Sequence, residues 1–191
     1  KYQDQAGQTA CKDIDPGYEQ DGTDNQKLCA KNKYQDEEGK AACKSLSAGY
    51  FCAEYVGANA RVLDMQGAVD DAVTDYQGCK KAANVEGGYF KAAGDDKPGK
   101  AAAGEYAPAA STPFATHNDP QADDAKPGAS APTDCEAGKY QDQLGQITCK
   151  LCDEGKYSAE TKQTAESTCT ACASGKYSTD GEGQTAESTC T

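Results

Sequence analysis

Apolar residues recur at helical spacing in one stretch of the chain. They follow the i, i+3, i+4 pattern of a single helix face: Val62, Met65, Val69, Val73 and Tyr76. We therefore expect one amphipathic helix near residues 60–76, with Asn59 as a candidate N-cap. Gly67 inside this stretch weakens a helix by about 1 kcal/mol relative to Ala.

Most of the remaining chain repeats a pattern that starts at Lys-Tyr and ends at Cys. Three copies nearly superpose, at residues 1–11, 33–43 and 139–149; two longer copies lie at 156–169 and 176–190, and a weaker one at 17–29. The three shorter copies place a glycine where a short hairpin must reverse: Gly7, Gly39 and Gly145. We expect two short strands in each copy and little other regular structure.

The full repeat is clearest near the C-terminus. It reads Cys-x-x-Gly-Lys-Tyr, then 8 to 12 residues, then Cys, two residues and the next Cys, and six cysteines fit it: Cys135, Cys149, Cys152, Cys169, Cys172 and Cys190. The glycine permits a turn with positive φ. The tyrosine offers a large apolar face that suits covering a disulfide while its hydroxyl stays in water.

Toward the N-terminus the repeat loses cysteines in a consistent way. Ile14 stands where the C-terminal copies have Cys152, and its expected partner position holds Gln26, so both members of one pair are missing together. Leu46 likewise replaces a cysteine after Cys43. Asn32 replaces the glycine, and Asn is the next best residue at positive φ.

The composition indicates that these repeats are not held together by an aliphatic core. Leu, Ile, Val and Phe number 15 of 191 residues, Trp is absent and the net charge is −12. Burial of so few aliphatic side chains cannot offset the entropy of ordering the chain. Disulfides among the eleven cysteines can offset this entropy, since disulfides stabilise small modules in oxidising compartments. We expect an extracellular or cell-surface protein.

Residues 94–134 differ from the repeats. They contain six of the seven prolines and no cysteine, which predicts an extended linker or stalk without helix or strand. Hydroxyl residues close to prolines are candidate O-glycosylation sites: Ser111, Thr112, Thr116, Ser130 and Thr133. The predicted organisation is degenerate repeats in 1–52, a helical insertion and connector in 53–93, the linker in 94–134, and three repeats in 135–191.

The unit in residues 135–190 resembles the cysteine-rich repeats called ephrin-receptor-like, and it is similar to the first module of TNF-receptor cysteine-rich domains. The match is good over 135–190, fair over 1–52 and absent from 53–134. The resemblance implies an elongated array of small disulfide-rich repeats and the pairing of successive cysteines: Cys135–Cys149, Cys152–Cys169, Cys172–Cys190 and Cys29–Cys43. Cys52 and Cys79 are then left over, and we predict that they pair and enclose the helix.

One cysteine, Cys11, remains without a partner. An odd cysteine in a secreted protein indicates an external partner. Lys1 begins within a repeat, so we expect the sequence to be a piece of a longer array. The partner of Cys11 then lies four residues before Lys1 or on a neighbouring copy.

A zinc site is the main alternative to disulfides at these cysteines. Cys149, Cys152, Cys169 and Cys172 have the spacing of a zinc ribbon, but Cys135 and Cys190 continue the same period, which favours disulfides. His117, the only histidine, lies in the predicted linker without a rigid surrounding. Three acidic pairs are candidates to hold calcium, but no EF-hand loop is present, so a solvated surface is the favoured interpretation: Asp70-Asp71, Asp95-Asp96 and Asp123-Asp124. We expect no cofactor, no metal and no catalysis, and no binding to nucleic acid or insertion into a membrane.

Two functions fit these expectations. The first is a structural segment of an extracellular fibre or surface appendage, whose partners are copies of itself or neighbouring repeats. The second is the ligand-binding or adhesive ectodomain of a receptor, for which glycans are candidate partners. The first is favoured because arginine, which is common in binding hot spots, occurs once, at Arg61.

Overall fold

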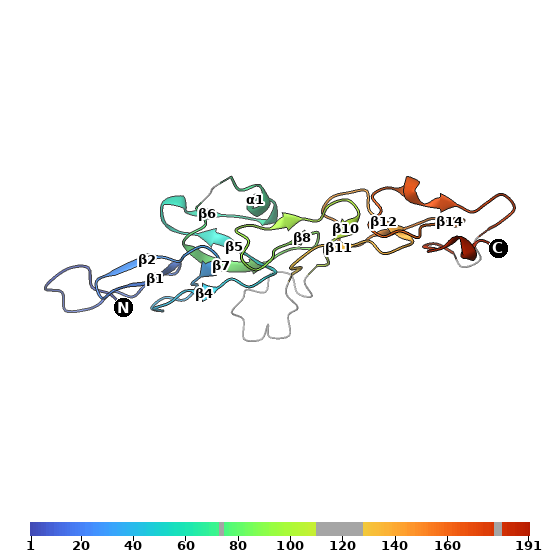
Figure 1. Ribbon diagram of the computed structural model, residues 1–191. Helices are drawn as coiled ribbons and strands as arrows, with labels where there is room; N and C mark the ends of the chain where they lie inside the picture. The colour runs from blue at the N-terminus through green and yellow to red at the C-terminus, as the bar shows by residue number, and fades with distance from the viewer. Residues whose placement is uncertain (73–74, 110–127, 178–180) are drawn as a thin grey trace. The chain divides into compact units, whose positions relative to one another are not determined.

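The computed structural model describes residues 1–72, 75–109, 128–177 and 181–191, and it divides the chain into two compact units. The first consists of Lys1–Glu86, Lys91–Pro98 and Ala110–Ser130, and the second of Gly87–Phe90, Gly99–Ala109 and Ala131–Thr191. Figure 1 shows both as short strands joined by long loops.

The first compact unit contains a hairpin and a five-stranded sheet. The hairpin pairs β1 (Tyr18–Asp21) with β2 (Asn25–Leu28). The sheet has the order β4-β3-β7-β5-β6, with β3 (Lys33–Tyr34), β4 (Lys44–Ser45), β5 (Tyr50–Tyr55), β6 (Arg61–Val62) and β7 (Cys79–Asn84). Its pairings are antiparallel except for β3 with β7.

The second compact unit is a series of antiparallel strand pairs, in which each strand has two residues. They are β8 (Tyr89–Phe90) with β9 (Gly99–Lys100), β10 (Glu105–Tyr106) with β11 (Thr133–Asp134), β12 (Lys139–Tyr140) with β13 (Lys150–Leu151), and β14 (Lys156–Tyr157) with β15 (Thr170–Ala171). Short 3-10 helices cover Glu166–Thr168 and Glu187–Thr189 here, and Gly57–Asn59 in the first unit. The predicted fold class, small disulfide-rich repeats built from short hairpins, is confirmed.

Tyrosines and disulfides form the cores. In the first unit Tyr34, Tyr55 and Tyr76 pack with Leu46, Ala82 and the cysteines of the Cys52–Cys79 disulfide. In the second, Tyr140 packs against the Cys152–Cys169 disulfide of the following repeat. In both clusters tyrosine rings pack with a disulfide, which is how a chain with few aliphatic residues excludes water from its interior.

The predicted helix is present but shorter than expected. Helix α1 covers Met65–Asp70, and the carboxylate of Asp64 caps it by accepting a hydrogen bond from the Gly67 amide at 2.7 Å. Val62 belongs to β6, where it pairs with Glu54 of β5 and leaves its side chain 76% exposed. Strand pairing therefore overrides the helical periodicity at Val62, and the assignment of Asn59 as N-cap is wrong.

The segment 94–134 is not free of regular structure. Its described residues contain β9, β10 and β11, so the expectation that it lacks strands is wrong there. Proline and alanine obscured the repeats because they fill positions that elsewhere hold cysteine. Residues 110–127, with His117, lie outside the described residues, and the four-part division of the chain stays a prediction. In the described part of the chain, no helix is long and apolar enough to cross a membrane.

Candidate functional site: the junction between repeats

The structure aligns eight repeats by one buried or half-buried residue each, which we call the anchor. The anchors are Ile14, Cys29, Leu46, Val85, Ala101, Cys135, Cys152 and Cys172. Three residues after each anchor comes a turn residue with positive φ: Gly17, Asn32, Gly49, Gly88, Gly104, Gly138, Gly155 and Gly175. Asn32 is thus confirmed at a left-handed position, with φ of 58°.

One backbone hydrogen bond recurs at seven successive junctions. The anchor N–H donates to the carbonyl of the preceding turn residue, over 2.7 to 3.0 Å: Cys29 to Gly17, Leu46 to Asn32, Val85 to Gly49, Ala101 to Gly88, Cys135 to Gly104, Cys152 to Gly138 and Cys172 to Gly155. Each of these bonds lies within one compact unit. The bond therefore does not depend on whether the anchor is cysteine.

Two further backbone bonds complete the junction. The N–H of the turn residue donates to a main-chain carbonyl of the next repeat, that of the sixth residue after its anchor. Examples are Gly88 to Ala107 and Gly138 to Ser158. The anchor carbonyl accepts from a positive-φ residue in the loop of the next repeat: Gly39 to Ile14, Gly78 to Cys29, Gly145 to Ala101, Lys162 to Cys135 and Gly183 to Cys152. Each repeat is in this way bonded to its neighbour through the main chain.

Several of the turn glycines also lack space for a side chain. A Cβ at Gly88 would lie 2.0 Å from the Gly145 carbonyl oxygen, and one at Gly138 would lie 2.2 Å from that of Gly183. Gly175 has the same backbone conformation, but nothing lies within 4 Å of its Cβ position. Glycine is therefore required at Gly88 and Gly138 both by conformation and by close approach of the next-but-one loop.

Three disulfides join an anchor to the residue three before the next anchor, a fourth joins the last anchor, Cys172, to Cys190, and the fifth is an exception. The repeat-type bonds are Cys29–Cys43, Cys135–Cys149, Cys152–Cys169 and Cys172–Cys190, and the exception is Cys52–Cys79, which encloses α1. These are the five pairs named in the sequence analysis. The four cysteines with zinc-ribbon spacing are all in disulfides. In the described part of the chain, no group of His, Cys, Asp and Glu is arranged to hold a metal.

Four repeats have lost both members of the pair. The replacements are Ile14 with Gln26, Leu46 with Ala82, Val85 with Pro98 and Ala101 with Pro132. The sequence analysis identified the replacement of both cysteines by Ile14 and Gln26. In the second repeat it identified Leu46 but not Ala82. It missed the repeats anchored at Val85 and Ala101, although Val85-Glu-Gly-Gly-Tyr and Ala101-Ala-Ala-Gly-Glu-Tyr retain the turn glycine and the tyrosine.

Cys11 has a free, exposed thiol. It lies three residues before the anchor Ile14, the position that Cys43, Cys149 and Cys169 occupy in their repeats. Among the candidate glycosylation sites, Ser130 and Thr133 are exposed, whereas Ser111, Thr112 and Thr116 lie outside the described residues.

A glutamine organises each of three loops, buried in two of them and half-buried in the third, a role that sequence reasoning missed. Gln141 Nε2 donates to the Thr148 carbonyl at 2.8 Å while its Oε1 accepts from the Gln143 amide at 3.0 Å. Gln3 and Gln35 make the same pair of bonds in their loops. The identical Tyr-Gln-Asp in all three copies was the available signal.

An ion pair closes each of the same loops. Lys150 Nζ lies 2.6 Å from Asp142 Oδ1, and this hydrogen bond lowers the pKa of the carboxyl and raises that of the amine. Lys12 with Asp4 and Lys44 with Asp36 repeat the arrangement. Burial raises the pKa of Tyr34, against which Lys44 stacks, to about 12.

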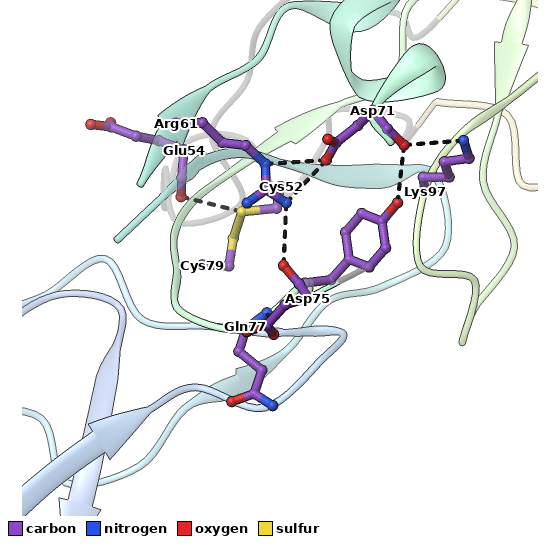
Figure 2. Close-up of polar contacts among 9 residues, drawn as sticks. Cys52, Glu54, Arg61, Asp71, Asp75, Gln77, Cys79 and Lys97 are labelled. Atoms are coloured by element: carbon purple, nitrogen blue, oxygen red, sulfur yellow. Dashed lines mark hydrogen bonds and ion pairs between the residues drawn. A yellow bond between two sulfur atoms is a disulfide. The ribbon is translucent and has the colours of Figure 1, made fainter. Parts of the chain in front are cut away.

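The insertion in the Leu46 repeat is held by the single arginine (Figure 2). Arg61 Nε and Nη2 lie 3.1 and 3.0 Å from Asp71 Oδ2, and the guanidinium stacks 3.9 Å from the centre of the Tyr55 ring. Tyr76 Oη and Lys97 Nζ donate to the Asp71 carbonyl. Burial raises the pKa of Tyr55. Arg61 therefore ties β6, α1 and β5 together rather than facing a ligand.

Beside this cluster lies a pocket of about 330 Å³. Its lining includes the apolar side chains of Phe51, Val62, Leu63 and Met65 and the charged residues Glu54, Asp64, Lys81 and Glu86. The pocket has the mixed lining of a small binding site.

Comparisons with known proteins do not assign a family. A scan against protein-family models found no match, and no curated protein matches the chain.

Proposed function

We propose that this chain is a repeat segment of an extracellular structural protein that builds a fibre or surface appendage. The observation that carries the proposal is the anchor-to-turn hydrogen bond at seven successive junctions. Repeats that bond chiefly to their neighbours form quasi-one-dimensional arrays, whose length can grow without a new core. The similarity of Cys-x-x-Gly-Lys-Tyr to ephrin-receptor-like repeats supports the same function.

The disulfides support the location. Five disulfides in a chain of this length are typical of proteins in oxidising compartments, outside the cytosol. We place the protein in the extracellular space or on the cell surface, with glycans carried at Ser130 or Thr133.

Cys11 supplies the link to a partner in this proposal. Its thiol is exposed, and its equivalents in other repeats are disulfide-bonded. Its partner is then a cysteine of an adjacent repeat, either on the same polypeptide or on a neighbouring copy.

Electron microscopy of native material, together with gels run without reductant, tests the proposal. We expect filaments, and a reductant-sensitive ladder that the Cys11→Ser variant lacks if the link joins copies. A Cys29→Ser, Cys43→Ser variant, which removes an internal disulfide, should keep the ladder. Native material that is monomeric on grids at every concentration would contradict the fibre proposal.

The pocket beside β6 favours a second candidate, a ligand-binding or adhesive ectodomain. In that case the repeats are spacers, and the insertion in the Leu46 repeat is the binding element. Saturable binding of the chain to a glycan array, abolished by Leu63→Asp and retained in Leu144→Asp, would support this function over the first. Leu144 is a suitable control because it is exposed and lies far from the pocket in sequence.

A further inference from the structure

One lysine of the first compact unit is fully buried. Lys91 is 0% exposed, and it is the only lysine or arginine in the described part of the chain that is buried. It lies six residues after the anchor Val85, a position that holds Gln35, Ala107, Gln141 and Ser158 in other repeats. The array therefore does not require a lysine at this position, and a buried ammonium is unfavourable there.

The amine of Lys91 lies against one side-chain amide. Its Nζ is 3.3 Å from Oδ1 of Asn32, a residue 59 positions away in the chain. The Asn32 amide is oriented, because its Nδ2 donates to the Gly94 carbonyl at 2.9 Å. Asn32 is also the one turn residue among the eight repeats that is not glycine.

The surroundings of Lys91 make its amine easier to deprotonate than an exposed one. Burial lowers the pKa of Lys91, and the nearby carboxylates of Asp95 and Asp96 oppose this shift. Asp96 is also paired with Lys31, at 3.2 Å, and Asp95 accepts a hydrogen bond from the Ala92 amide. An uncharged amine is a nucleophile, and burial of the Lys91 side chain limits the access of water to it, whereas Asn32 is half-buried.

We propose that Lys91 and Asn32 react to form an intramolecular isopeptide bond. Lys91 Nζ attacks Cγ of Asn32, the bond from Cγ to Nδ2 breaks, and Nδ2 leaves as ammonia with the proton that Nζ gives up. The step changes no oxidation state and needs no further reactant. Positioning compensates for a poor leaving group, because oriented groups react with effective concentrations of about 10⁵–10⁸ M.

The bond strengthens the array where a disulfide is absent. The Val85 repeat has Val85 and Pro98 in place of the cysteine pair. An isopeptide between Lys91 and Asn32 links this repeat to the Cys29 repeat, and unlike a disulfide it resists reduction. The inference stands whether the array is a fibre or a receptor stalk.

Mass spectrometry of the full chain tests the bond. After reduction, the intact mass is expected to be lower than that of the sequence by one ammonia molecule. Cleavage after Asp and Glu should yield residues 25–36 joined to residues 87–95 in one branched peptide. Asn32→Gly and Lys91→Gln, which introduce residues that other repeats carry at these positions, should have the full mass and the two peptides separate.

The same experiment can overturn the proposal. Recovery of residues 87–95 from the wild-type chain as a linear peptide, with Lys91 unmodified, shows that no bond forms. Ammonia loss that persists in Lys91→Gln would come from another asparagine and has the same meaning. Because both variants use residues that the fold accepts elsewhere, they should remain folded, and their far-UV circular dichroism checks this.

Discussion

The Cys135 and Ala101 repeats differ in their covalent bonds but share one set of backbone bonds. Both anchors are fully buried, and each donates its N–H to the preceding turn glycine at 2.9 and 3.0 Å. Each anchor carbonyl accepts from a loop residue of the next repeat, Lys162 or Gly145. Cys135 is bonded to Cys149, whereas Ala101 has Pro132 at the partner position. We call these shared backbone hydrogen bonds the backbone frame. The backbone frame therefore specifies the repeat, and the disulfide adds stability to it.

This difference explains how the chain tolerates the loss of cysteines. A disulfide acts mainly on the unfolded chain, by reducing its entropy. Removing both cysteines leaves no buried polar group unsatisfied, so an apolar pair such as Ala101 and Pro132 can take their place. At Gly88 and Gly138 the turn glycine has no such substitute, because it meets both a conformational and a steric requirement.

Substitution of a turn glycine should have the largest effect. Gly88→Ala and Gly138→Ala place a Cβ 2.0 and 2.2 Å from a backbone oxygen, so we expect a loss of about 3 kcal/mol or more in the free energy of unfolding. The control Gly175→Ala meets only the conformational penalty, about 1 kcal/mol. Guanidinium unfolding measures all three, and equal losses would show that the close approach is unimportant.

Removing a disulfide should destabilise without changing the fold. The double variant Cys135→Ala, Cys149→Ala has alanine as its anchor, as the Ala101 repeat does, and it opens a loop with a sequence separation of 14, so about 3 kcal/mol is lost. Amide chemical shifts outside residues 135–149 should be retained. Their collapse to random-coil values would mean that the disulfide, rather than the backbone frame, specifies the repeat.

The converse variant adds a disulfide to a repeat that lacks one. Val85 and Pro98 are both buried and stand at the two cysteine positions. Val85→Cys with Pro98→Cys should oxidise spontaneously and stabilise the chain by about 2–3 kcal/mol relative to its reduced form. Thiol titration and unfolding with and without reductant measure this. Two titratable thiols in addition to that of Cys11 under oxidising conditions would show that the alignment of this repeat is wrong.

Loss of a loop glutamine should have a smaller effect. Gln141→Ala removes the acceptor for Gln143 N–H and the donor to the Thr148 carbonyl, for an expected loss of about 1–2 kcal/mol. Gln143→Ala, which changes an exposed side chain in the same loop, is the control and should change stability by less than about 0.5 kcal/mol. Thermal unfolding compares the two.

The sequence predicted the repeats wherever cysteine marked them. Cys135 to Cys190 carry spacing, glycine and tyrosine together, so their hairpins were expected. Val85 and Ala101 were missed because a buried anchor needs only to be small or apolar, a requirement that alanine-rich sequence meets at many positions. Their partner positions hold proline, which indicated a linker instead. The tyrosine and turn glycine that follow each anchor were too weak a pattern alone.

The junction between repeats could not be predicted from residue types for a similar reason. The junction consists of main-chain groups, whose partners depend on packing between loops and leave no mark on side-chain type. Glycines with positive φ were expected, but the oxygen beside Gly88 comes from Gly145, which no local pattern predicts. The helix was overestimated because Val62 pairs with Glu54 of the neighbouring strand, a contact that helical periodicity does not reveal.

Hydrogen exchange at the anchor amides tests the central claim most directly. The seven donors are Cys29, Leu46, Val85, Ala101, Cys135, Cys152 and Cys172. If the backbone frame specifies the repeat, Leu46, Val85 and Ala101 will be protected from exchange to an extent comparable with the cysteine anchors. Exchange of these three amides at the rate of an unstructured peptide, while the cysteine anchors stay protected, would contradict the account.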